Sequence, residues 1–147
     1  LFSFIYIYAK NNEEFYKFAK CIVLTMLSAL VIFIFFQTSV SRPIIVGDDV
    51  FSNMIRNIYA NDRPVNCCPS LHVALALICS IWVCRVSENK ILKSTVIIVG
   101  YLIILSTLFI KQHVIMDVVV AFVQVLILRN IVDRNSYIEY DEALKIR

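Results

Sequence analysis

Four long apolar stretches limit what this chain can fold into more than any other feature of its sequence. They cover residues 21–40, 64–84, 94–110 and 112–128, and Asp117 is the only Asp, Glu, Lys or Arg within them. A membrane-spanning α-helix needs about 20 predominantly apolar residues, with a range of roughly 17–25. The first three stretches meet that length, and the fourth does so when residues 130–132 are added. The sequence therefore predicts an all-α integral membrane bundle with four full transmembrane helices, the second starting near Ser70.

The composition agrees with a membrane protein. Hydrophobic residues make up 60% of the chain and the mean hydropathy is +0.79, whereas soluble domains are roughly 45–50% apolar. With only two glycines and three prolines, neither a loop-rich β fold nor a disordered chain is expected. The net charge of +3 comes without the dense basic patch of a nucleic-acid site, so no nucleic-acid partner is predicted.

The first nine residues, LFSFIYIYA, form a shorter apolar run that stops at Lys10. As a helix they would rise about 14 Å, less than half of a hydrocarbon core of about 30 Å. No basic segment precedes them, as one would in a secretory signal peptide. We interpret residues 1–20 as the end of a spanning helix whose beginning is missing, followed by a cytoplasmic loop.

The five cysteines predict free thiols. Three lie inside apolar stretches, where cysteine is usually a small buried hydrophobe. The adjacent Cys67 and Cys68 could pair only through a strained ring, and no C-x-x-C spacing indicates a zinc site. No metal and no cofactor is predicted.

The basic residues predict which side of the membrane each loop occupies. Counting alternate loops places ten basic residues on one face and four on the other, and the positive-inside rule puts the ten in the cytoplasm. Both histidines then start their helices at the extracytoplasmic face of a multi-pass protein of the plasma or cytoplasmic membrane. The same surface gathers Arg42, Arg63 and Lys111.

Asp117 follows His113 by four residues, which on a helix puts both side chains on one face. A carboxylate within a span is costly without a partner and is a functional candidate by default. His113 is its natural partner, and such a contact would fix the imidazole tautomer and leave the other ring nitrogen free, as a basic or nucleophilic histidine requires.

His72 lies two residues after Ser70, which follows Pro69 and is a plausible helix N-cap whose free N–H groups would favour an oxyanion. Two histidines, one carboxylate and several cations can form a phosphate-transfer site without metal ligands. One histidine would attack phosphorus and the other would protonate the leaving oxygen. Each residue alone has a plain structural interpretation, as an interfacial histidine or an intrahelical pair, and it is their occurrence on one face that favours a site.

The segments PSLHVA (69–74) and STLFIKQHVIMD (106–117) resemble the type 2 phosphatidic acid phosphatase (PAP2) superfamily of membrane lipid phosphatases. Its second motif, Pro-Ser-Gly-His, is matched at residues 69, 70 and 72. Its third motif, Ser-Arg, five residues, His, three residues, Asp, is matched by Ser106, His113 and Asp117. The Arg-Pro half of the first motif is matched by Arg42 and Pro43. The resemblance covers roughly residues 35–128.

Three motif positions depart from the family pattern. Leu71 replaces glycine, Thr107 replaces the arginine of the third motif, and Phe35 stands at the lysine position of the first. The leucine form resembles the branch of inositol phosphorylceramide synthases. Lys111 could supply the cation that Thr107 lacks.

A competing match to the first motif runs from Arg56 to Arg63 and Pro64. We prefer Arg42 because it directly follows a span, and keep Arg63 as a reserve phosphate ligand.

By this resemblance, His113 is the nucleophile that forms a phosphohistidine, Asp117 orients it, and His72 is the general acid. The residues expected to bind phosphate oxygens are Arg42, Ser70, Lys111, Arg63 and Ser106. The family needs no divalent metal. It implies a catalytic membrane domain at residues 21–132, with six spans in the family core against four and a partial one here. Residues 133–147 would form a cytoplasmic tail.

The resemblance leaves three functions open. The first is a phosphatase acting on a lipid phosphate or diphosphate at the extracytoplasmic face. The second is a phosphotransferase that passes the phosphoryl group to another alcohol, and the third is a catalytically silent membrane fragment. Residues 45–56 could form a short helix that covers the site.

Overall fold

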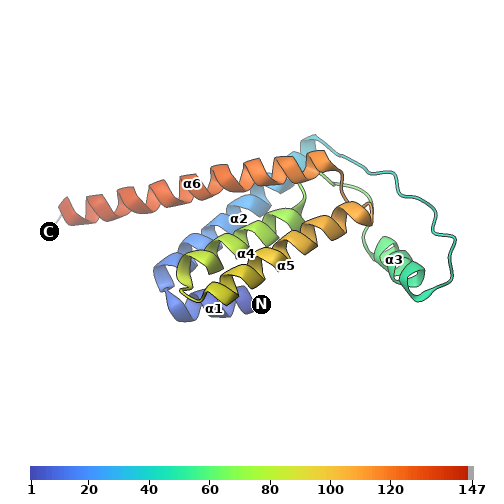
Figure 1. Cartoon of the computed structure of the whole chain (residues 1–147). Coiled ribbons are helices and arrows are strands. Elements are labelled where there is room, and N and C mark those ends of the chain that lie inside the picture. The colour runs from blue at the N-terminus through green and yellow to red at the C-terminus, as the bar shows by residue number, and fades with distance from the viewer. Residues whose placement is uncertain (146–147) are drawn as a thin grey trace.

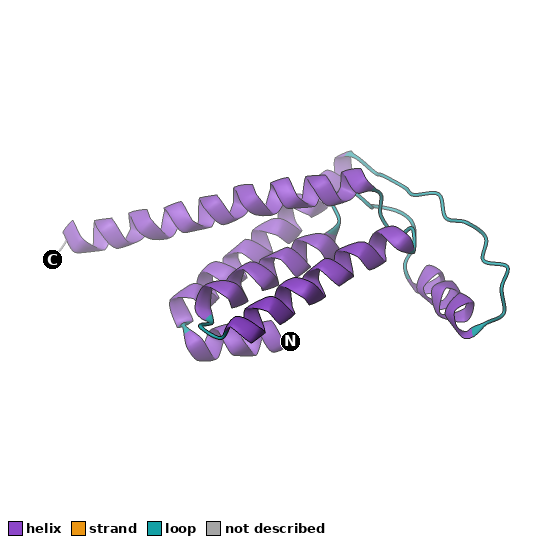
Figure 2. Cartoon of the chain, viewed as in Figure 1, coloured by secondary structure: helices purple, strands orange, loops and turns teal. Residues whose placement is uncertain are grey.

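The chain folds into helices throughout. The computed structural model describes the backbone of residues 1–145 and the side chains of residues 1–137. Within these residues there are six helices and no strand (Figure 2). The helices are α1 (Phe2–Lys10), α2 (Asn12–Phe35), α3 (Val50–Asn61), α4 (Leu71–Val86), α5 (Lys90–Phe109) and α6 (Ile115–Lys145). The prediction of an all-α fold is confirmed.

Short polar side chains start four of these helices by capping free backbone N–H groups. Asn11 accepts a hydrogen bond from the N–H of Glu14 at 3.0 Å, and Asn89 from that of Ile91 at 2.9 Å. Asp49 caps α3 and Ser70 caps α4. The predicted start of the second apolar helix at Ser70 is therefore confirmed.

Among the described residues, three helices are long and apolar enough to cross a membrane: α2, α5 and residues 115–137 of α6. The fourth apolar helix, α4, has 16 residues and rises about 24 Å, less than the full span that its sequence predicted. It contacts α1, α2, α5 and α6, and it lies at the centre of the bundle (Figure 1). Because other helices surround it, α4 is apolar on all sides.

The core forms around α4. Trp82 and Phe18 are fully buried with ring centroids 6.1 Å apart. Val73, Ile78 and Val125 are fully buried in the same core. Residues 1–10, predicted as a partial span, form α1, which packs on α2 and α4.

Helices extend into the segments expected as a loop and a tail. α2 begins at Asn12, so most of the loop expected before residue 21 is helical. α6 continues to Lys145 through most of the expected tail, and residues 146–147 lie outside the described residues. At this end of the bundle, Arg85 of α4 pairs with Asp133 of α6 at 2.8 Å and Glu14 of α2 at 3.1 Å.

Candidate active site

At the opposite end of the bundle, α2 and α5 end and α4 and α6 begin (Figure 1). A polar pocket lies at this end. The pocket is lined by Phe33, Arg42, Asp62, Arg63, Val65, Asn66, Cys67, Leu71, His72, Gln112 and His113. The fold thus brings together both histidines and both candidate first-motif arginines, which lie between positions 42 and 113 of the sequence.

His113 lies in the turn before α6, not on the helix itself as its spacing to Asp117 suggested. The turn is closed by the carbonyl of Thr107, which accepts hydrogen bonds from the N–H groups of Gln112 at 3.0 Å and His113 at 3.2 Å. Lys111 adopts φ of 54° there. The turn projects the imidazole of His113 back over the first turn of α6.

The expected contact between His113 and Asp117 is present. Nδ1 of His113 lies 3.3 Å from Oδ2 of Asp117, which also accepts a hydrogen bond from the N–H of Val114 at 3.0 Å. His113 and Asp117 are therefore joined not along a helix but through a cap, in which the Asp117 carboxylate binds the residues just before α6. With Nδ1 engaged, Nε2 is the nitrogen of His113 left to face a substrate.

A backbone contact joins the starts of α4 and α6. The N–H of Ser70 donates to the carbonyl of Asp117 at 3.3 Å. It holds His72 near His113, with ring centroids 5.8 Å apart and the ring planes at 59°. A small group between the rings could contact both.

Burial sets the protonation of His113. The residue is 8% exposed, and this burial lowers the pKa of its imidazole below the usual 6.5, against the opposing effect of the Asp117 carboxylate. Burial disfavours the charged form, so His113 is neutral at pH 7. A neutral imidazole retains the lone pair that a nucleophile needs.

Arg42 is held by groups that the sequence did not single out. Its Nη2 donates to the Asp62 carboxylate at 2.9 Å, its Nη1 donates to the Asp62 carbonyl, and its guanidinium lies over the ring of Tyr59, 4.6 Å from the centroid. Gln112 donates to the same Asp62 oxygen at 3.0 Å. The side chain of Arg42 is only 7% exposed, so it is fixed beside the histidines rather than solvated.

Sequence reasoning missed Asp62, Gln112 and Tyr59 as members of this end of the molecule. Asp62 and Gln112 are the immediate neighbours of Arg63 and His113, and that adjacency is the one signal that could have found them. Arg63 lines the pocket and is exposed.

Three other residues predicted to bind phosphate do not line this pocket. Ser70 is fully buried, and its Oγ accepts from the N–H of Val73 at 3.4 Å. Ser106 is exposed, and its Oγ donates to the carbonyl of Ile103 at 2.8 Å. Lys111 is exposed and lines a separate, largely apolar hollow that also reaches His113.

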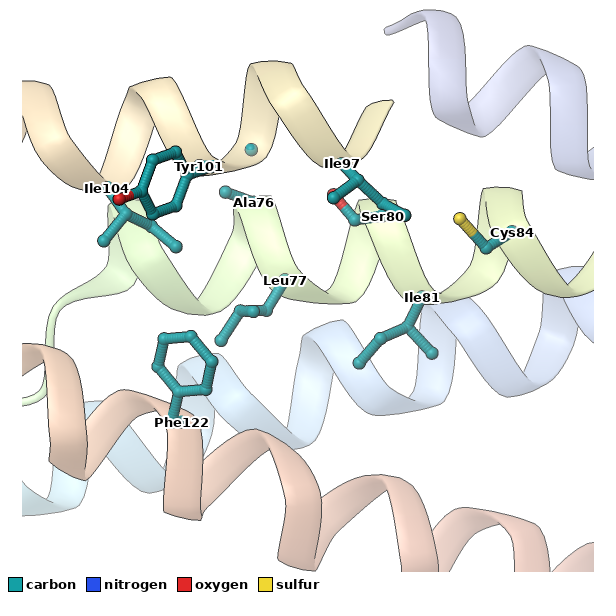
Figure 3. A pocket seen from close by; sticks show the side chains of 10 residues that line it. Ala76, Leu77, Ser80, Ile81, Cys84, Ile97, Tyr101, Ile104 and Phe122 are labelled. Atoms are coloured by element: carbon teal, nitrogen blue, oxygen red, sulfur yellow. The ribbon is translucent and has the colours of Figure 1, made fainter. Parts of the chain in front are cut away.

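Apolar hollows lie along the helices below the pocket. One is lined by α4, α5 and Phe122 of α6, with Ala76, Ser80 and Tyr101 among its walls (Figure 3). Another lies between α1, α4 and α5 and has His72 as one of its lining residues. His72 therefore borders both the polar pocket and an apolar groove. Within the described residues, no group of three His, Cys, Asp or Glu side chains is arranged to hold a metal ion.

Comparison with protein families agrees with the motifs. The family described as the PAP2 superfamily matches residues 1–130, a longer segment than the motifs alone cover. Comparisons with curated proteins and with solved structures give no match. The match covers most of the chain, the fold is an all-helical membrane bundle, and the motif histidines lie in one pocket. This chain therefore belongs to the PAP2 superfamily.

Proposed function

We propose that the protein is a membrane lipid phosphatase that acts through a phosphohistidine on His113. The superfamily suggests phosphatase or phosphotransferase chemistry. The observation that carries the finer proposal is the buried His113–Asp117 pair facing His72 in a pocket shared with Arg42 and Arg63.

In the first step, Nε2 of His113 attacks the phosphorus of the substrate, and the bond from phosphorus to the lipid oxygen breaks. His72, as the protonated general acid, gives that oxygen its proton. Water then attacks the phosphorus of the phosphohistidine, and His72 takes up a proton from the water. The bond from phosphorus to Nε2 of His113 breaks, and inorganic phosphate leaves. No redox partner is needed.

Asp117 supports this step by accepting a hydrogen bond from Nδ1–H of His113. The contact orients the ring and stabilises the positive charge that develops as Nε2 bonds to phosphorus. Arg42 and Arg63 would neutralise the phosphate oxygens, since guanidinium groups bind phosphate through paired N–H donors. Arg42 must then exchange Asp62 for the substrate or share its donors between them.

The apolar groove that His72 borders supports a lipid as the leaving group. Its walls include Leu75, Cys79, Val99 and Ile103, which offer hydrocarbon contacts next to the proposed general acid. We infer that the site opens on the extracytoplasmic side, because most basic residues of the chain lie at the opposite end of the bundle.

A phosphotransferase of the inositol phosphorylceramide synthase type is the second candidate. The same groove favours it, because an alcohol of another lipid could approach His72 along the path used by the leaving group. Acceptor and leaving oxygen occupy the same position in the two half-reactions, so the residues and their roles are unchanged.

The test is phosphate release by the purified protein from phosphatidate, phosphatidylglycerophosphate and polyprenyl diphosphate, with excess chelator. We expect turnover of at least one substrate, loss in His113→Ala and retention in Tyr16→Phe, a control at an exposed position of α2. Residual activity in His113→Ala above about a thousandth would contradict the covalent role, since acid–base help alone is worth about 10²–10⁴. Release only when an alcohol acceptor is added would favour the phosphotransferase.

A further inference from the structure

The helix α3 has an apolar face that the rest of the described chain leaves largely exposed. None of its residues is buried. Val50, Phe51 and Met54 are 72%, 77% and 58% exposed. Met54 follows Val50 by four residues and Phe51 by three, which puts it beside both of them on one side of the helix. Large apolar side chains gathered in this way mark an interaction surface.

The other side of α3 is polar. Ser52, Asn53 and Arg56 lie there, and Asp49 caps the first turn. Ile55 and Ile58 continue the apolar face and are half-buried. This is the pattern of an amphipathic helix at a boundary between an apolar phase and water.

The segment before α3 also exposes large apolar side chains. Ile44 and Val46 are 90% and 86% exposed. Arg56 binds this segment through the carbonyl of Ile45 at 3.1 Å and the carboxylate of Asp48 at 3.1 Å. We call residues 44–61 the α3 unit.

The α3 unit lies to one side of the bundle, near the end where α5 stops and α6 starts (Figure 1, Figure 2). Tyr59 ties it there, since its hydroxyl donates to the carbonyl of Ile110 at 2.7 Å. The candidate spans are α2, α5 and α6. The α3 unit therefore lies near the helix ends at which these spans would leave the bilayer.

We propose that the α3 unit lies in the interface of the bilayer that the bundle crosses, with Val50, Phe51 and Met54 directed into the lipid. Exposed apolar surface costs about 25 cal/mol per Å² in water, and the nearest apolar phase at this end of the bundle is the membrane itself. Interfacial helices bury their apolar face about 5–10 Å into the headgroup region. Tyr59 is also suited to that level, because tyrosine is enriched at membrane interfaces.

This placement bears on the pocket, and in that respect rests on the proposed function. The C-terminal end of α3 carries Tyr59 and Asp62, the two residues that hold Arg42. Lipid immersion of α3 would therefore fix Arg42 at the height of the phosphate headgroups. The unit would favour substrates presented in a bilayer over substrates dissolved in water.

The first test measures how deeply α3 lies in the bilayer, and it does not depend on enzymatic activity. Met54→Trp and Asn53→Trp place a fluorophore on the apolar and polar faces, and Trp82 is kept in both as a common background. In vesicles of phosphatidylcholine brominated near the headgroup end of its chains, we expect stronger quenching of Met54→Trp. Equal quenching of the two variants would overturn the proposal. So would a Met54→Trp emission that changes with the protein-to-lipid ratio, because it would show that a second copy of the chain covers the face.

The second test separates this proposal from the function. We expect the double variant Phe51→Ser and Met54→Ser to lose activity several-fold on a lipid phosphate in vesicles and to keep it on a short-chain, water-soluble phosphate. Equal loss on both substrates would contradict an interfacial role. If the native protein hydrolysed neither substrate, the proposed function would fail while the quenching result still decided the position of α3.

Discussion

At the scale of single residues, Asp117 connects the parts of the pocket. Its Oδ2 lies 3.3 Å from Nδ1 of His113 and accepts the N–H of Val114 at 3.0 Å, while its carbonyl accepts the N–H of Ser70 at 3.3 Å. One residue thus orients the proposed nucleophile, caps α6 and holds the start of α4. Only the first of these contacts needs a negative charge.

The substitution Asp117→Asn separates those contacts. Its amide oxygen can still cap Val114, so we expect the helix and the thermal stability to be kept. A neutral amide cannot stabilise a positively charged His113, so kcat should fall by about 10²–10⁴. Phosphate release and circular dichroism measured on the same preparation check this, and full activity in the variant would show that the pairing has no role in the reaction.

The sequence predicted the meeting of residues that lie close to the ends of the apolar helices. His72 and His113 lie at the starts of the second and fourth apolar segments, so topology alone brought them to one end of the bundle, and Arg42 followed for the same reason. The contacts of Asp62 and Gln112 could not be predicted. They depend on the path of the irregular segments 36–49 and 110–114, where no periodic pattern restricts the backbone.

At the scale of elements, the polar caps set where helices start, and ion pairs decide how far α2 extends. Residues 12–20 resembled a charged loop. In the structure Lys17 bonds Glu13 at 2.7 Å and Glu14 at 3.3 Å, and Glu14 reaches Arg85. Neighbouring charges three and four residues apart stabilise a helix, and a partner on another helix cannot be recognised from one sequence.

The helix α4 allows the role of Ser70 to be tested. Because its buried hydroxyl caps α4, we expect Ser70→Ala to lower the free energy of unfolding by about 1 kcal/mol, with little change in KM. Ser70→Asn should restore stability, and Ser94→Ala on the exposed side of α5 should change neither quantity. Thermal unfolding and substrate titration in detergent measure both effects. A raised KM with unchanged stability would mean that the hydroxyl binds phosphate instead.

At the scale of the whole molecule, the two ends of the bundle have different electrostatic character. One end joins α2, α4 and α6 through Glu14, Arg85 and Asp133. The other holds the histidine pocket and the pair between Arg42 and Asp62. Most basic residues lie at the first end, so by the positive-inside rule we propose that this end is cytoplasmic and that the pocket opens on the far side of the membrane.

Labelling of intact cells with a membrane-impermeant maleimide tests this orientation. The background is a chain in which the five free cysteines are replaced, and single cysteines are introduced as Asp48→Cys and Glu88→Cys. Both positions are exposed, one beside the pocket end and one between α4 and α5. We expect rapid labelling at position 48, and labelling at position 88 only after the cells are permeabilised. The reverse pattern would place the pocket in the cytoplasm, where the substrate would be a lipid phosphate of the inner leaflet and α3 would lie against that leaflet instead.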